Sequence, residues 1–333
     1  MHHQQIYTPI QAAQPLVTFI VTYYNLPMQM LCECIDSILA LSLAKDEREI
    51  IIIDDGSKVS PMNALMKYGD DIVYIRQHHQ GVSVARNTAL HMAKGAFIQI
   101  VDGDDILIKE PYKQCLDIAR SHPDAEIIVF DFSTTPTMVT VSKDDVKQLS
   151  GVAYLSNHNI QGSICCKLFR QSVRSQLEFT PGICYGEDEE FTPQLILRAE
   201  VVYLTPYKAY YYRQHKDSAI QQHDESSKEK RLNDNLQVIR HLQLLADRMP
   251  YNDRLAMNRR VAQLTMDYIY NVIMLYHSPK VLNTTVNTLR QYGLFPLPNH
   301  DYTTKYTWFR RITSTSIGRT LLLHTLPLIN KER

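Results

Sequence analysis

The sequence has few cysteines, no net charge and no long apolar run. Its six cysteines include no CxxC pair, which argues against a zinc knuckle or a redox motif and favours reduced, mostly buried thiols. The 35 basic residues balance the 35 acidic ones, so the overall charge indicates no nucleic-acid partner. No apolar run approaches the roughly 18–20 residues of a membrane span, and residues 1–14 lack the pattern of a secretory signal. We therefore expect a cytoplasmic protein.

The zero net charge is the sum of two regions of opposite charge. Residues 221–333 contain 16 basic and 9 acidic residues, a net charge of +7, which leaves −7 for residues 1–220. With 44% hydrophobic and 21% charged residues the chain can bury a core, and 333 residues suggest one large domain or two ordinary ones. The positive charge of residues 221–333 is compatible with binding of this region to an anionic surface.

The first 135 residues alternate short apolar runs with helical stretches. The runs are rich in β-branched residues and predict strands buried on both faces of a parallel sheet, at Leu16–Thr22, Glu49–Asp54, Ile72–Arg76, Ala96–Val101 and Glu126–Phe132. Helical periodicity between them predicts helices over Met28–Leu41, Val82–Lys94 and Pro111–Ser121. This pattern is typical of an open, doubly wound α/β sheet, in which ligands bind beyond the carboxyl ends of the strands.

The second half of the chain has a different pattern. Val201–Arg213, with five tyrosines, indicates β structure, and Glu225–Arg248 and Asn252–Tyr276 predict long helices. Tyr306–Leu328 combines aromatic, basic and leucine residues and predicts one further helix, ended by Pro327. That helix either packs on the rest of the protein or lies on an anionic membrane as a basic amphipathic helix.

Three carboxylates follow one strand within four residues, in Asp102-Gly103-Asp104-Asp105. Their repulsion raises their pKa values on burial unless a cation lies between them, and hard oxygen ligands suit Mg²⁺, Mn²⁺ or Ca²⁺. The spacing excludes the EF-hand calcium loop. Asp and Gly after a strand are also ordinary turn residues, so the motif alone leaves metal binding and a simple turn open.

Polar residues follow two other strands in the same way. Thr22-Tyr23-Tyr24-Asn25 ends the first run and Asp54-Asp55-Gly56-Ser57 ends the second, where each could equally be a turn or a helix start. Together they place polar groups at the edge of the sheet where a nucleotide would lie. Gly81 precedes the next predicted helix, and Arg86 lies in the first turns of that helix. Arg86 either contacts a bound anion or holds one of the Asp motifs through a salt bridge.

Two later segments also carry ionisable side chains. Gly186–Phe191 (GEDEEF) puts four acids at the start of a helix, where they either serve the helix dipole or include a carboxylate that accepts a proton. Tyr210–Ser218 brings Arg213, His215 and Lys216 together after an aromatic strand. These cations are either structural or serve a polyphosphate or a metal.

In their order along the chain, these motifs resemble glycosyltransferase family 2, the nucleotide-sugar-dependent enzymes with a GT-A fold. They are VTFIVTYYN, IDSIL, EIIIIDDGS, GVSVARN, AKGAFIQIVDGDD, CKLFR, YGEDEEF and YYYRQHKDSAI. The resemblance implies a Rossmann-like, mostly parallel sheet flanked by helices, with a catalytic domain over 15–220, an extension over 1–14 and a helical C-terminal region over 221–333. Within the catalytic domain, 15–135 would bind the nucleotide and 136–220 would face the acceptor.

The resemblance also assigns residues to the nucleotide. Thr22, Tyr24 and Asp55 match positions that hold the uracil and ribose of the donor, and Arg86 matches the Arg of the ARN motif. The full set implied to contact the nucleotide is Thr22, Tyr24, Asp55, Arg86, Asp102, Arg213 and Ser218.

The metal and the catalytic base follow from the same resemblance. Asp102-Gly103-Asp104 matches the metal-binding DxD motif, with Asp104 as the direct ligand of Mn²⁺ or Mg²⁺, and His215 matches an element that closes over the metal in some relatives. Asp188 matches the catalytic base.

The implied activity is inverting transfer of a sugar from a UDP-sugar to an acceptor hydroxyl. The bacterial enzymes that the chain most resembles suggest capsule, lipopolysaccharide or other surface-glycan assembly, with a glycan or lipid-linked acceptor and contact with the inner face of the plasma membrane through the basic C-terminal region. One alternative is nucleotidyl transfer, which the absence of Gly and Lys from Val17–Asn25 disfavours. Another is a non-catalytic nucleotide-sugar-binding or membrane-surface scaffold with the same fold.

Overall fold

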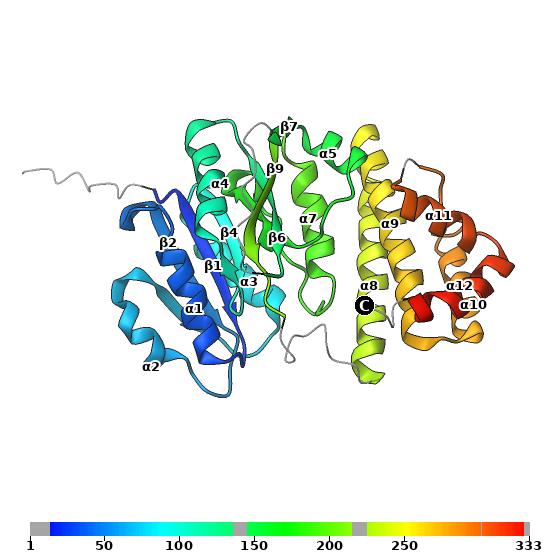
Figure 1. Cartoon of the computed structure of the whole chain (residues 1–333), viewed down its shortest axis with the longest axis horizontal. Helices are drawn as coiled ribbons and strands as arrows, with labels where there is room; N and C mark the ends of the chain where they lie inside the picture. The colour runs from blue at the N-terminus through cyan, green and yellow to red at the C-terminus, as the bar shows by residue number, and fades with distance from the viewer. Residues whose placement is uncertain (1–13, 136–144, 215–224, 301, 330–333) are drawn as a thin grey trace, which may run out of the picture.

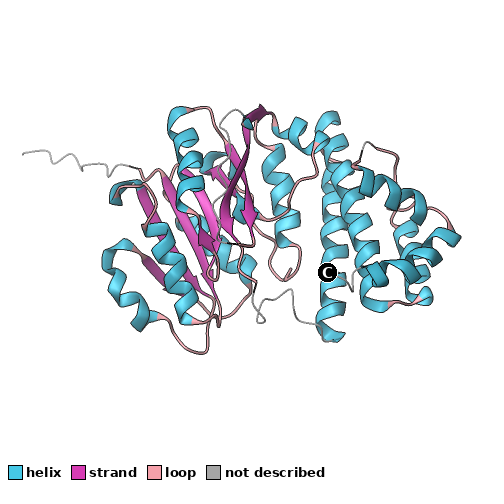
Figure 2. Ribbon diagram, in the orientation of Figure 1, coloured by secondary structure: helices cyan, strands magenta, loops and turns pink. Residues whose placement is uncertain are grey.

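A sheet with its helices and a second, all-helical part lie side by side in the computed structural model (Figures 1 and 2). The structure describes residues 14–135, 145–214, 225–300 and 302–329. In this part of the chain the sheet has nine strands in the order β3-β2-β1-β4-β8-β6-β9-β5, with β7 paired to β9. The strands are β1 (Val17–Tyr23), β2 (Arg48–Asp54), β3 (Val73–Arg76), β4 (Phe97–Asp102), β5 (Ile106–Leu107), β6 (Ile127–Ser133), β7 (Lys147–Leu149), β8 (Lys167–Arg170) and β9 (Val202–Tyr211).

The helices alternate with the strands at first and then follow them. The α-helices are α1 (Met28–Leu39), α2 (Met62–Leu65), α3 (Val82–Met92), α4 (Lys109–Ser121), α5 (Gly151–Asn157), α6 (Gln171–Arg174), α7 (Glu187–Leu197), α8 (Glu225–Ala246), α9 (Tyr251–Tyr276), α10 (Pro279–Gln291), α11 (Thr304–Thr313) and α12 (Ser316–Ile329). Short 3-10 turns lie at Lys45–Glu47, Met66–Asp71 and Ile164–Cys166.

The five strands predicted in the first 135 residues are confirmed as β1, β2, β3, β4 and β6. Every residue of β1 is buried, which requires cover on both faces of the sheet and explains its unbroken apolar run. β3, β2, β1 and β4 are parallel neighbours, whereas β8 lies antiparallel between β4 and β6. The α/β fold is therefore as expected, with a sheet that is parallel on one side and mixed on the other.

The C-terminal helices have an apolar core of their own. Residues of α8, α9, α10 and α12 form a cluster separate from the one around the sheet, and α8 and α9 also pack against α7. None of the helices in the described residues is both long enough and apolar enough to cross a membrane.

The prediction of one helix over Tyr306–Leu328 is wrong. The structure has two helices, α11 and α12, separated at Ser314 and Thr315. Hydroxyl groups account for the break, because Ser314 Oγ donates to the Arg311 carbonyl and Thr315 Oγ1 accepts from the amide of Gly318. Pro327 lies inside α12 and does not end it.

Candidate active site

The carboxyl ends of β1, β2 and β4 meet at one edge of the sheet. In the parallel register Thr22 of β1 pairs with Asp102 of β4, and Tyr23 pairs with Asp54 of β2. Because these strands run in the same direction, the polar residues that follow them lie side by side. The motifs expected to share this edge therefore do so.

The turn after β4 lies close against β1. The amide of Gly103 donates to the carbonyl of Thr22 at 3.1 Å, and a Cβ atom at Gly103 would lie only 2.7 Å from that oxygen. A side chain at this position would force the two segments apart, so the turn requires glycine. Asp102 and Asp104, on either side of Gly103, line a cavity at the strand ends.

Asp105, the last carboxylate of the motif, is buried at 1% exposure. It accepts hydrogen bonds from the Tyr210 hydroxyl and from the amide of Arg213, both at 2.8 Å, and so ties the turn to β9. Burial, together with the charges of Asp102 and Asp104, raises the pKa of Asp105 to about 8. The motif thus serves both as a structural turn and as a concentration of negative charge.

The donor set of this turn fits a hard divalent cation. Carboxylates are preferred ligands of Mn²⁺ and Mg²⁺, which commonly take one or two protein carboxylates and fill other positions with phosphate oxygens and water. Asp102 and Asp104 supply such a pair. In the described ranges no three His, Cys, Asp or Glu side chains converge as a complete metal site. His215, the third predicted ligand, lies outside the described residues.

Arg86 of α3 lies among three carboxylates and is only 2% exposed. Its Nη1 donates to Asp188 Oδ1 at 2.7 Å and to Glu187 Oε1 at 3.1 Å, while Nη2 donates to Asp102 Oδ1 at 3.0 Å. Of the two roles left open by the sequence, the structure shows the salt bridge. Arg86 joins the turn after β4 to the start of α7.

The first turn of α7 presents Asp188 to the cavity. Gly186 precedes the helix with φ of 89°, in the left-handed region that favours glycine. Besides Arg86, Asp188 accepts a hydrogen bond on Oδ2 from the amide of Ile164 at 3.1 Å. Burial raises the pKa of Asp188, and the adjacent guanidinium opposes that increase. Burial and then Asp188 raise the pKa of Glu187 to about 7.

The residues predicted to hold the base and ribose, Thr22, Tyr24 and Asp55, line the same cavity. Tyr24 stacks on the ring of His79, with centroids 4.1 Å apart and planes at 8°. Asp55 is 3% exposed, and its carboxylate accepts from the amide of Gly81 at 2.9 Å and contacts His79 Nδ1 at 2.8 Å. His79, which our sequence reasoning missed, therefore fixes both predicted residues.

One predicted nucleotide contact, Arg213, is not brought to the cavity. Arg213 does not line it, although Tyr212 and Gln214 on either side do. Its guanidinium instead forms an ion pair with Glu33 of α1, with Nη1 and Oε2 2.5 Å apart. Ser218 lies outside the described residues.

The cavity has a volume of about 1090 Å³ and extends well beyond the strand edge. Its far side is formed by α8 and α9, which the sequence assigned to a separate helical region. No local motif marks their contribution, because it depends on which face of each helix meets the catalytic half. The polar residues that line it from these helices are Arg231, Asn235, Asp267, Tyr268 and Asn271.

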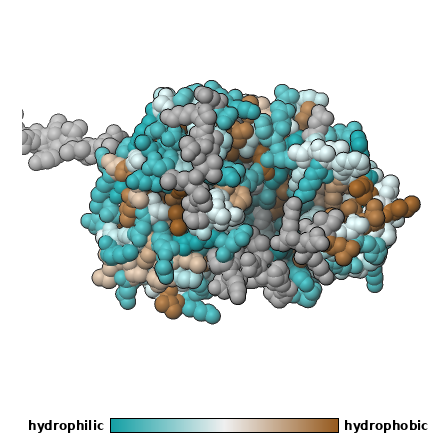
Figure 3. Space-filling view, in the orientation of Figure 1, coloured by the Kyte–Doolittle hydropathy of each residue, from teal (hydrophilic) through white to brown (hydrophobic). Residues whose placement is uncertain are grey.

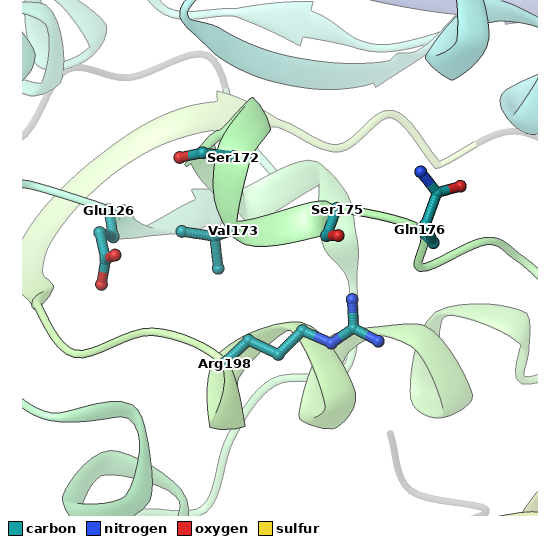
Figure 4. A pocket seen from close by; sticks show the side chains of 6 residues that line it. All are labelled: Glu126, Ser172, Val173, Ser175, Gln176 and Arg198. Atoms are coloured by element: carbon teal, nitrogen blue, oxygen red, sulfur yellow. The ribbon is translucent and has the colours of Figure 1, made fainter.

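A second pocket, of about 500 Å³, lies at the opposite end of β6 (Figure 4). It contains one acid and one base and no paired carboxylates, histidine or cysteine, so we assign it no chemistry. The residues that line it are Glu126, Ser172, Val173, Ser175, Gln176 and Arg198.

Comparison with solved structures defines the class of this fold. The crystal structure of Staphylococcus aureus TarS residues 1–349 in complex with UDP-GlcNAc superposes with a TM-score of 0.69 at 17% identity, over 95% of this chain and 91% of that one. A mannosyltransferase from Pyrobaculum calidifontis in complex with GDP-Man and Mn²⁺ gives a TM-score of 0.54 at 14% identity, over 96% and 88% of the two chains. The fold is that of the GT-A glycosyltransferases, with a helical C-terminal region.

The sequence comparison agrees with this class of fold. Residues 18–173, just under half of the chain, match the model of glycosyl transferase family 2. The uncharacterized glycosyltransferase EpsJ of Bacillus subtilis is 28% identical over 228 residues, which cover 61% of this chain and 62% of EpsJ. Matches to the first three curated relatives cover between 23% and 62% of those proteins, so this chain spans less than two thirds of their length.

Proposed function

We propose that this protein transfers a sugar from a UDP-sugar to an acceptor hydroxyl with inversion of configuration. One observation carries the proposal: Arg86 joins the Asp102–Asp105 turn to Asp188 inside a single cavity that also reaches Thr22, Tyr24 and Asp55. The residues proposed to contact the nucleotide, to bind a metal and to act as the base thus line one cleft, which supports a single displacement at a nucleotide sugar.

The residues of the cleft have different roles in the proposed reaction. Thr22, Tyr24 and Asp55 hold the uridine at the carboxyl ends of β1 and β2. Asp188 removes the proton from the acceptor hydroxyl as that oxygen attacks the anomeric carbon from the face opposite the leaving diphosphate. Arg86 keeps Asp188 oriented and favours its ionised form, which is the form that accepts a proton.

A divalent cation completes the proposal. Asp104, assisted by Asp102, would hold Mn²⁺ or Mg²⁺ at the turn after β4. When bound, such an ion stabilises the negative charge that develops on the departing nucleoside diphosphate. Burial first, and then the charges of Asp102 and Asp104, raise the pKa of Asp105, and the second cause supports this placement because it reports the negative charge at the turn.

The names of the relatives support the donor and the biological setting. TarS of S. aureus, 25% identical over 200 residues, is a poly(ribitol-phosphate) β-N-acetylglucosaminyltransferase. Its solved complexes contain UDP-GlcNAc and UDP. We accordingly propose a UDP-sugar as the donor and surface-glycan assembly, such as that of capsule or lipopolysaccharide, as the setting.

Calorimetry with UDP tests the donor site. We expect UDP to bind the purified protein tightly with MnCl₂ and about tenfold or more weakly in EDTA. Asp104→Asn should abolish the effect of manganese, whereas Asp124→Asn, an exposed carboxylate outside the cleft, should retain it. Failure of the wild type to bind UDP in the presence of Mn²⁺ and also of Mg²⁺ would contradict the proposal.

The C-terminal helices support a contact with an anionic membrane. α11 and α12 expose Trp308, Ile317, Leu321 and Leu328 at 54–85%. Figure 3 shows hydrophobic side chains gathered over the end of the molecule where Figure 1 draws these helices. From residue 302 to residue 330 the sequence has four basic residues and no acidic one. Apolar side chains combined with positive charge are typical of helices that lie on anionic lipid. Such a contact would hold the protein at the inner face of the plasma membrane.

A further inference from the structure

The cleft continues from the strand edge onto α8 and α9, beyond the segment that matches the family model. Figure 1 shows both helices beside α7, on the side away from β1. Asp188 and the residues of α8 and α9 line one cavity. An acceptor that reaches Asp188 from the side away from the nucleotide would therefore lie against these two helices.

Each helix presents a single stripe of residues to this space. The residues of α8 that line it are Arg231, Asn235, Val238 and Ile239, at spacings of four, three and one. α9 contributes Asp267, Tyr268 and Asn271 with the same helical periodicity. Residues at these spacings share one face of a helix, so the stripes are continuous walls of the cleft.

Side-chain contacts from the start of α7 hold α8 and α9 beside Asp188. Glu189 pairs with Arg260 of α9, and Glu190, which is 2% exposed, pairs with His241 of α8. The four successive acids at the start of α7 are thus each held, two by Arg86 and one by each C-terminal helix. The loop before α7 is also anchored, because Asp234 of α8 accepts from the amide of Cys184 at 2.8 Å.

The charge of this part of the cleft disfavours an anionic acceptor. Among the described residues, Glu187, Asp188, Glu189 and Asp267 bring four carboxylates to it. Three arginines oppose them: Arg231 from α8, Arg86, which three carboxylates already hold, and Arg260, which pairs with Glu189. A phosphate-bearing polymer would meet net negative charge here, and like charges in a partly desolvated site repel strongly.

The uncharged groups suit carbohydrate instead. The side-chain amides of Asn235 and Asn271 both donate and accept hydrogen bonds, as sugar hydroxyls require. Tyr185 and Tyr268 add aromatic rings against which the C–H face of a sugar packs. We propose that the groove between α7, α8 and α9 binds the acceptor, and that this acceptor is a neutral, hydroxyl-rich glycan. The inference rests on the proposed transferase function.

Two kinds of acceptor test the charge preference. UDP-sugars are first screened, and the one that gives the fastest UDP release is used as the donor. Neutral tetrasaccharides of the chitin, cellulose, starch and galactan types are then compared, as acceptors, with synthetic oligo(ribitol phosphate). We expect a neutral glycan to raise the rate of UDP release, with kcat/KM about tenfold or more above that of the phosphate oligomer, a difference of about 1.4 kcal/mol. A preference for oligo(ribitol phosphate), or stimulation by none of these compounds although UDP binds, would overturn the proposal.

Matched asparagine variants test the location. Asn235→Ala should raise the KM for the neutral glycan by about fivefold or more, because the proposed hydrogen bond between this side chain and the glycan is lost. Asn233→Ala, on the exposed side of the same helix, should not. Asn271→Ala on α9 provides a second variant should the first fail to fold, and the Kd for UDP is measured for each protein. Equal KM values for the Asn235, Asn271 and Asn233 variants would overturn the location. If the wild type failed to bind UDP, the proposed function itself would be wrong.

Discussion

Nη1 of Arg86 lies 2.7 Å from Oδ1 of Asp188 and donates a hydrogen bond to it. The other terminal nitrogen of the same guanidinium donates to Asp102, in the turn proposed to bind the metal. One buried cation therefore connects the proposed base with the proposed metal-binding turn. A change at either end alters the electrostatic environment of the other.

Removal of the carboxylate at residue 188 should abolish transfer. Asp188→Asn keeps the size of the side chain and an acceptor for Arg86 but cannot take a proton, so we expect a loss of about 10²–10⁴-fold in kcat. UDP binding, measured by calorimetry, should change little. Glu187→Gln, one residue away, should retain at least tenfold more activity than Asp188→Asn. Equal losses in the two variants would contradict the assignment of the base to Asp188.

Removal of Arg86 should destabilise the protein in a pH-dependent way. Arg86→Ala leaves Asp102, Glu187 and Asp188 without their shared cation, which costs about 3–5 kcal/mol for a buried pair. The pKa values of Glu187 and Asp188 in the folded state are already raised, and they should rise further. At pH values above the pKa that these acids have in the unfolded chain, the folded form then binds more protons than the unfolded form. The free energy of unfolding therefore falls as pH rises.

Urea denaturation at pH 5.5 and pH 8 checks this expectation. The loss in the free energy of unfolding of Arg86→Ala should be larger at pH 8. Arg120→Ala is the control, because Arg120 pairs with Glu47 at the surface and its removal should cost at most about 1 kcal/mol at both pH values. A loss in Arg86→Ala that is the same at both pH values would argue against strong coupling of the three carboxylates to this cation.

The contact between Glu190 and His241 should couple α7 to α8. Glu190 is buried, so His241→Ala leaves a buried carboxylate without its partner, at a cost of about 1–3 kcal/mol. The double variant with Glu190→Gln should recover part of that loss, because the unpaired charge is removed. Thermal unfolding of the two single variants and the double variant gives the coupling energy. Strict additivity would show that the two side chains do not stabilise each other.

The apolar side chains of α11 and α12 should govern binding to lipid. Leu321→Glu places a negative charge among them and should weaken binding to vesicles of phosphatidylglycerol and phosphatidylcholine by about tenfold. Leu244→Glu is the matched control, since Leu244 on α8 is exposed to a similar degree, 51% against 54%. Co-sedimentation measures the bound fraction. No difference between the two variants, or equal binding to pure phosphatidylcholine, would contradict the membrane contact.

Local patterns in the sequence predicted the first half of the fold well. The five apolar runs became strands. The first predicted helix also formed, and its buried residues are Leu31, Cys34, Ile35 and Ile38. The spacing of apolar residues indicates which residues face the core, so strands and helices with a buried face can be predicted from the sequence. The helix predicted over Tyr306–Leu328 was wrong, because hydrogen bonds from hydroxyl groups at Ser314 and Thr315 decide the break, and periodicity does not report them.

The sequence by itself determined that acids and polar groups follow neighbouring parallel strands, and hence that a cleft with Asp55, Asp102 and Asp104 forms at one edge of the sheet. Only the tertiary structure decided that Arg86 bridges to Asp188, 102 residues along the chain, and that α8 and α9 complete the cleft. The reason is physical: strand direction and burial are encoded locally, whereas the partner of a buried charge and the face that two helices turn toward a site depend on packing between distant segments.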